Sequence, residues 1–118
     1  MDFETKDPII RPGAKVDPAA TIVAGEDLPA VVGAYAVVEA GAKIIGANIG
    51  AYATVKADAV IEEGVYIGDF AMIEEDTRLP AGAKVPSRAV ASGDPFTIVR
   101  GLTTEELDEA KARSSAAV

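Results

Sequence analysis

The stretch that decides the fold runs from Ile49 to Lys84 and divides into six units of six residues: IGAYAT, VKADAV, IEEGVY, IGDFAM, IEEDTR and LPAGAK. Each unit opens with an aliphatic residue and carries a small or β-branched residue four places later. A period of six fits neither the 3.6-residue period of an amphipathic helix nor the wider spacing of hairpin turns. It indicates short stacked strands joined by corners.

The same repeat extends in both directions from this stretch. Upstream, the openers are Ile10, Val16, Ile22, Val32, Val38 and Ile44, with an insertion at AGEDLPA and one short unit before Ile49. Downstream, the rhythm ends after Val85 and Ala91, and a helix capped by Thr103 or Thr104 follows. We therefore expect a lead-in or cap at residues 1–9, a repeat domain at 10–100, a helix at 101–114 and a frayed tail at 115–118.

If three units form one coil, a coil takes about eighteen residues and the domain holds four to five coils. The openers should then stack inward as a core that includes Val55, Ile61, Ile67, Ile73 and Leu79. Large residues outside the inward positions are candidates for oligomer or partner contacts: Tyr35, Tyr52, Tyr66, Phe70 and Leu107.

Glycines also recur in register with the openers. One set lies three residues after an opener and comprises Gly13, Gly41, Gly64 and Gly82. A second set lies one residue after an opener and comprises Gly33, Gly50 and Gly68. Because corners demand backbone conformations that a Cβ disfavours, we expect both sets to occupy such conformations.

Composition reduces the number of functions that the chain can have. The 118-residue chain has a net charge of -8, which opposes binding to nucleic acid or anionic membranes, and it contains no cysteine for disulfides, thiolate catalysis or metal ligation. The acidic N-terminus lacks the basic and apolar regions of a signal peptide, and no stretch reads as a membrane span. We expect a cytoplasmic protein without a cofactor.

The repeat resembles the hexapeptide repeat of left-handed parallel β-helix proteins. Within that group, VKADAVIEEGVYIGDFAMIEEDTRLP and LPAGAKVPSRAVASGDPFTIVRGLTTEEL are similar to segments of the gamma-class carbonic anhydrase-like family. The resemblance implies an all-β, left-handed parallel β-helix with a C-terminal α-helix packed alongside it. It also implies a homotrimer.

The functional residues of that family do not carry over. Its Arg-x-Asp element corresponds to Lys56 and Asp58, and its Asn-x-Gln-Asp element corresponds to Met72, Glu74 and Glu75. Pro80 stands where the first zinc-binding histidine would follow, and the chain contains no histidine at all. A gamma-class site holds its metal through imidazoles, and hexapeptide acyltransferases use a histidine as general base, so neither reaction is expected from this chain alone.

Three functions stay open at this point. The first is a non-catalytic trimeric scaffold or assembly subunit that associates with an enzyme, with Lys56, Asp58, Glu74 and Glu75 as a relic site or subunit contact. The second is an enzyme or ligand-binding protein whose site uses carboxylates or is completed by a partner that supplies histidines. The third is an acyl-CoA-dependent transferase with unusual residues.

Overall fold

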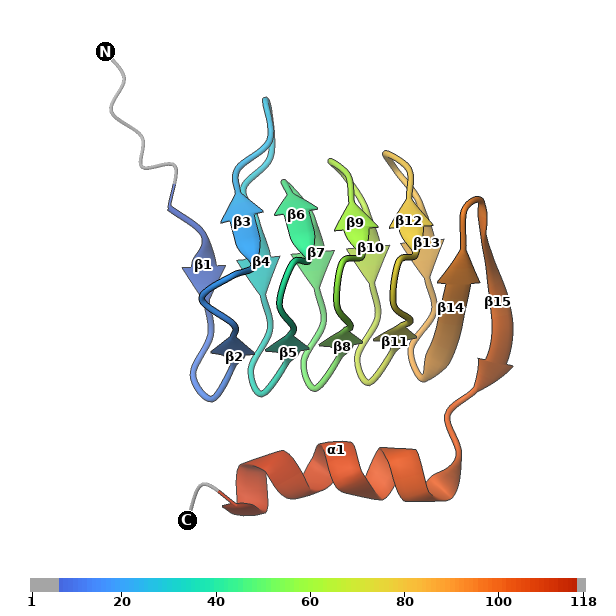
Figure 1. The fold of residues 1–118 in the computed structure, drawn as a ribbon. Helices are drawn as coiled ribbons and strands as arrows, with labels where there is room; N and C mark the ends of the chain where they lie inside the picture. The colour runs from blue at the N-terminus through green and yellow to red at the C-terminus, as the bar shows by residue number, and fades with distance from the viewer. Residues whose placement is uncertain (1–6, 117–118) are drawn as a thin grey trace.

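A triangular prism of three sheets, parallel except for the last strand of one of them, forms the body of the computed structural model, which describes residues 7–116 (Figure 1). Sheet A contains β1 (Ile9–Ile10), β4 (Val31–Val32), β7 (Asn48–Ile49), β10 (Tyr66–Ile67) and β13 (Lys84–Val85). Sheet B contains β2 (Lys15–Val16), β5 (Val37–Val38), β8 (Thr54–Val55), β11 (Met72–Ile73), β14 (Ala89–Gly93) and β15 (Phe96–Gly101). Sheet C contains β3 (Thr21–Val23), β6 (Lys43–Ile45), β9 (Val60–Ile61) and β12 (Arg78–Leu79).

Successive coils pair in parallel, so that Ile49 lies beside Ile67 and Val55 beside Ile73. The prediction of a left-handed parallel β-helix with a C-terminal helix is confirmed, with about five coils. The residues inserted at AGEDLPA form the loop between β3 and β4, and the short unit before Ile49 turns at Gly46 with φ of +55°. Both departures from the six-residue period are therefore absorbed at corners, and the strands keep their register.

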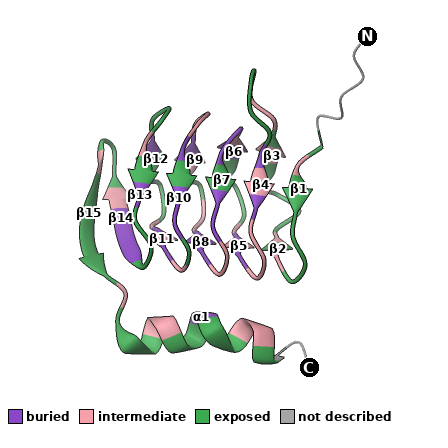
Figure 2. Cartoon of the chain, turned by 180° about the vertical axis from the view of Figure 1, so that it is seen from behind, coloured by how far each residue is buried: buried purple, intermediate pink, exposed green. Residues whose placement is uncertain are grey.

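The core is a set of inward columns that run along the prism (Figure 2). All five openers named above as core residues are fully buried, as are the small residues between them: Val55, Ile61, Ile67, Ile73 and Leu79, with Ala53, Ala59, Val65, Ala71 and Thr77. Burial weakens at the first coil, where Ile10 keeps 43% of its surface exposed because β1 is the end strand of sheet A. The lead-in expected at residues 1–9 falls largely outside the described residues, and Ile9 already belongs to β1.

The expectation for the corner glycines is wrong for one of the two sets. Gly33, Gly50 and Gly68 do not have positive φ. A Cβ on Gly50 would lie 2.7 Å from the backbone nitrogen of Asp69, so these glycines instead allow adjacent coils to approach closely. The positive-φ position is three residues after the opener, where Gly41, Gly64 and Gly82 occur.

Bulky residues occupy the same left-handed position at the corner between sheets A and B. Tyr35, Tyr52 and Phe70 have φ of 60°, 63° and 63°, although this region is unfavourable for large side chains. Their rings stack along the prism, with centroids 5.3 Å apart between Tyr35 and Tyr52 and 4.8 Å apart between Tyr52 and Phe70. Arg88 extends the column with its guanidinium 5.9 Å from the Phe70 ring. Stacking between adjacent coils offsets the strain of the turns.

After the last coil, β15 returns antiparallel to β14 and leads into α1 (Thr104–Ala116), which starts and ends slightly later than the expected 101–114. Thr103 caps the helix: its hydroxyl accepts a hydrogen bond from the Glu106 backbone N–H (3.1 Å), and Glu106 Oε1 accepts one from the Thr103 N–H (2.9 Å). Figure 1 shows α1 lying along the outer face of sheet B. Within residues 7–116, no helix is long and apolar enough to cross a bilayer.

Candidate functional site

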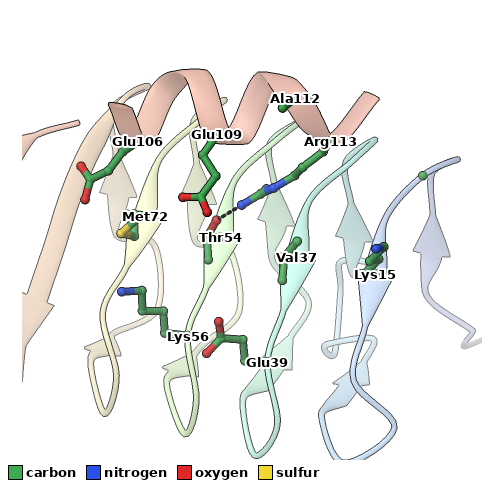
Figure 3. Close-up of a pocket in the computed structure, with 11 residues that line it drawn as sticks. Lys15, Val37, Glu39, Thr54, Lys56, Met72, Glu106, Glu109, Ala112 and Arg113 are labelled. Atoms are coloured by element: carbon green, nitrogen blue, oxygen red, sulfur yellow. Dashed lines mark hydrogen bonds between the residues drawn. The ribbon is translucent and has the colours of Figure 1, made fainter. Parts of the chain in front are cut away.

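A groove separates α1 from the outer face of sheet B and encloses about 550 Å³ (Figure 3). Its floor consists of outward-facing residues of β2, β5, β8 and β11 together with the residues that follow these strands, and its roof is one side of α1. The lining residues are Gly13, Lys15, Val37, Glu39, Thr54, Lys56, Met72, Glu106, Glu109, Ala112 and Arg113. The volume falls within the range of about 300–1,000 Å³ that is usual for ligand pockets.

Arg113 fastens the C-terminal half of α1 to the prism. Its Nη1 donates hydrogen bonds to the carbonyl oxygens of Tyr35 (3.0 Å), Tyr52 (3.0 Å) and Ala53 (3.4 Å), and its Nη2 donates one to Thr54 Oγ1 (2.6 Å). Burial without a directly bonded carboxylate lowers the pKa of the Arg113 guanidinium. One side chain therefore joins the helix to the corner that carries the aromatic column.

An ion pair anchors the other end of α1. Arg100, at the end of β15, donates to both carboxylate oxygens of Glu106, at 2.7 and 2.8 Å. These hydrogen bonds, followed by the one from the Thr103 N–H, lower the pKa of Glu106 to about 2. The helix is thus held at two points, and the groove lies between them.

The candidate site residues are only partly brought together. Lys56 Nζ lies 3.2 Å from Glu74 Oε1 across adjacent coils, and both side chains are about one-third exposed, at 32% and 30%. Asp58 occupies a left-handed position (φ 61°) at the corner between sheets B and C, and Glu75 is exposed at the same corner of the next coil. The structure therefore links Lys56 with Glu74, whereas the side chains of Asp58 and Glu75 make no hydrogen bond or ion pair among the described residues.

Charge is distributed unevenly along the groove. Glu106 and Glu109 lie on the half of α1 above Met72 and Thr54, whereas Arg113 and Lys15 lie toward the first coils, with Val37 between them (Figure 3). The part of the groove over the first two coils therefore holds these two cations together with the carboxylate of Glu39 and the apolar side chain of Val37. Sequence reasoning did not identify this division because it depends on where α1 crosses the sheet.

A second feature missed by the sequence analysis is the contact between Glu63 and the loop at residues 24–30. Glu63 Oε2 accepts hydrogen bonds from the backbone N–H groups of Asp27 (2.7 Å) and Leu28 (3.1 Å). These bonds, that of Asp27 foremost, lower the pKa of Glu63. Gly25 lies against the Glu63 side chain, where a Cβ would be 2.5 Å from the Glu63 carboxyl carbon. The glycine in AGEDLPA is therefore the sequence feature that could have indicated a close contact with this loop.

The residues predicted to make oligomer or partner contacts have different surroundings. Tyr52 and Phe70 belong to the stacked column, and Leu107 is half-buried on α1. Tyr66 is 47% exposed on the outer face of sheet A. Their role in an interface stays a prediction.

No protein-family model matches the chain. A search of curated proteins found similarity to gamma carbonic anhydrase 2, mitochondrial, of Arabidopsis thaliana, with 30% identity over 98 residues that cover 83% of this chain and 35% of the plant protein. The chain thus spans about a third of the length of that relative.

Solved structures with the same architecture establish the fold. A maltose O-acetyltransferase from Clostridium difficile 630 superimposes with a TM-score of 0.59 at 16% identity, covering 81% of this chain and 70% of that one. A Bacillus cereus protein assigned as an acetyltransferase gives a TM-score of 0.54 at 19% identity, covering 96% of this chain and 89% of that one. The chain has the hexapeptide-repeat β-helix fold. At these identities the structural likeness establishes the fold, and the sequence similarity relates the chain to gamma carbonic anhydrase.

The residues present do not fit a gamma-class zinc site. Lys56 and Glu74 are paired with each other, Met72 offers only a thioether, and Pro80 follows β12 at a different corner and offers no side-chain donor. Among the described residues, no group of three His, Cys, Asp or Glu side chains is arranged to hold a metal ion. Zinc prefers imidazole and thiolate ligands, and the chain contains neither histidine nor cysteine.

Proposed function

We propose that this chain is a non-catalytic, trimeric β-helix scaffold or assembly subunit that associates with an enzyme. The observation that carries the proposal is the ion pair between Lys56 and Glu74. Both residues stand where the gamma carbonic anhydrase-like family has functional polar groups, and here each satisfies the charge of the other across adjacent coils. An intact β-helix whose charged groups at this site pair with each other suits a subunit that contributes shape rather than chemistry.

Two properties support the trimeric state. The resemblance to gamma-class carbonic anhydrase-like proteins implies a homotrimer, and closed cyclic symmetry is the usual way in which identical chains associate. Outer faces of the prism also carry exposed apolar side chains, among them Ile9 (43%), Tyr66 (47%) and Val99 (53%). The cytoplasmic location expected from the sequence stays a prediction, and the similar plant protein is a mitochondrial one.

The test is a native mass measurement combined with zinc analysis and a CO₂ hydration assay on the purified chain. We expect a mass of three chains, substoichiometric zinc and no hydration above the uncatalysed rate. Stoichiometric zinc together with CO₂ hydration would refute the non-catalytic role. A monomeric mass at micromolar concentration would refute the trimer.

One observation favours a second candidate, a ligand-binding protein or an enzyme completed by a partner. The groove beneath α1 is large enough for a small molecule, and its lining includes the carboxylates of Glu39 and Glu109 and the amine of Lys15. Purification from native cells separates the two candidates. A mixed assembly that contains a second, histidine-bearing chain and zinc would support the partner-completed site, whereas a second enzyme chain with its own complete site would support the scaffold.

A further inference from the structure

The two ends of the prism, marked by β1 and β15 in Figure 1, are closed to different degrees. At the C-terminal end, Phe96 on β15 packs against the core, and the last two openers, Leu79 and Val85, are fully buried. At the N-terminal end, the inward residues of the first coil keep contact with solvent, and Ile10 is 43% exposed. These inward residues are Ile10, Ala14, Val16, Ala20 and Ile22.

The open end is a depression in the apolar core. The inward residues of the first coil, together with Pro8, line a space of about 450 Å³. The openers that follow in the second coil, Val32, Val38 and Ile44, are at most 1% exposed, so the first coil is an interior layer without a cover. The strands β1, β2 and β3 are also the end strands of their sheets, and uncovered edges of this kind pair readily with other chains.

Residues 1–6, of sequence MDFETK, lead directly to this opening and lie outside the described part of the chain. Pro8 stands at the depression, so the segment starts beside it. Phe3 precedes Pro8 by five residues, which in extended form span up to about 17 Å. The cube root of 450 Å³ is about 8 Å, so the segment is long enough to cross the depression.

The sequence of the segment suits an apolar surface on one side and water on the other. Phe3 stands between Asp2 and Glu4. Neighbouring side chains of an extended segment point to opposite sides, so a segment that crosses the end with Phe3 inward keeps both carboxylates in solvent. An aromatic side chain buries about 150–250 Å² of surface, and Phe96 already packs against the core from the strand that follows the last coil.

We propose that residues 1–6 cross the open end of the prism as a cap and that Phe3 fills the depression lined by the first coil. The cap covers the exposed inward residues and shields the edges of β1, β2 and β3, so that the chain associates through its outer faces and not end to end. This inference goes beyond the scaffold role and does not depend on the number of chains in the assembly.

Because the chain contains no cysteine, disulfide trapping tests the cap directly. Phe3→Cys is combined with Val16→Cys or with Ile22→Cys, which alter the inward residues of β2 and β3. The matched controls combine Phe3→Cys with Lys15→Cys or Thr21→Cys, the more exposed outward neighbours on the same strands. Each protein is oxidised mildly at low concentration, and mass spectrometry identifies the linked peptides and the mass of the product.

We expect at least one inward link to form about fivefold or more faster than the link to its outward neighbour, because a disulfide requires Cβ atoms about 3.5–4.5 Å apart. The product should have the mass of one chain. If neither inward link forms faster than its outward control, the cap is overturned. A product of two linked chains would show that the segment covers a second copy and would also overturn the proposal.

Hydrogen exchange provides a second readout. Phe3→Ser removes the apolar contact, and we expect the amides of β1, β2 and β3 to exchange about tenfold faster while those of β9 stay unchanged. Glu4→Ser is the matched control, since this side chain points to solvent in the cap, and Phe3→Leu should retain most of the protection. Unchanged exchange in Phe3→Ser, or equal effects of Phe3→Ser and Glu4→Ser, would contradict the proposal.

Discussion

The interior of the prism and the face beneath α1 are built from the same two-residue strands. In β9, for example, Ile61 is fully buried, whereas its neighbour Val60 faces outward and is only partly buried. Inward positions repeat from coil to coil, but the outward column of sheet B changes at each step, as Lys15, Val37, Thr54, Met72 and Val90. The inward residues, which repeat from coil to coil, therefore specify the fold, and the outward residues, which differ from coil to coil, specify the groove. The following predictions test that division.

The largest effect should come from a charge in the interior. Ile61→Asp places a carboxylate in the middle of an apolar column, and we expect a loss of more than about 4 kcal/mol in the free energy of unfolding, or failure to fold. Val60→Asp, one residue earlier on the outward side, should cost less than about 1 kcal/mol. Urea denaturation of both variants measures the contrast, and similar losses would contradict the assignment of the two faces.

On the groove side, the largest effect should come from Arg113. Arg113→Met keeps the aliphatic stem but removes the hydrogen bonds to the Tyr35, Tyr52 and Ala53 carbonyls and to Thr54, and we expect a loss of about 1.5–3 kcal/mol. Hydrogen exchange should accelerate in α1 and remain slow in the strands, because the helix loses one of its two anchors. The exposed Lys111, substituted as Lys111→Met, is the control and should change neither quantity.

One interior position departs from the apolar rule and should become more stable on substitution. Thr77 is fully buried, and its hydroxyl has no hydrogen-bond partner among the described residues. Thr77→Val removes this unsatisfied group while keeping the shape, and we expect a gain of about 1–2 kcal/mol. Thr54→Val should instead destabilise, because the Thr54 hydroxyl accepts a hydrogen bond from Arg113. A loss of stability in Thr77→Val would mean that the hydroxyl is satisfied.

The smallest effect concerns the ion pair that anchors the start of α1. The pKa of Glu106 is lowered from 4.5 to about 2 in the folded state, so its contribution is present above pH 4.5 and is lost as the pH falls toward 2. The difference in melting temperature between the native chain and Glu106→Gln should be constant near neutrality and shrink across that window. Glu105→Gln, on the exposed side of the same helical turn, should give no such difference.

The sequence predicted the interior well and the groove poorly, for a physical reason. The six-residue period alone placed Ile61, Ile67 and Leu79 in the core, because identical coils give identical surroundings. By contrast, the contacts of Arg113 with Thr54 and of Glu63 with Leu28 join residues that are far apart in the chain and occupy no repeated position. Periodicity carries no information about such pairs.

The corner residues fall between these extremes. The glycine spacing correctly marked the position three residues after each opener as the left-handed one, as Gly64 shows. The same rule applied to Tyr52 and Phe70 would have predicted positive φ and a ring column, but large residues argue against that conformation when each is considered alone. Asp58 and Asp76 adopt the same φ at this repeat position, so the corner itself requires it, and stacking across coils stabilises the rings that occupy it.

That column makes the register of the coils observable by spectroscopy. The chain contains three tyrosines and no tryptophan. Two of the tyrosines, Tyr35 and Tyr52, stack at 5.3 Å on adjacent coils, whereas Tyr66 stands apart on sheet A. Contacts between stacked phenols contribute to the near-ultraviolet circular dichroism, so we expect a slip of one coil against the next to change the spectrum even where the content of secondary structure stays the same.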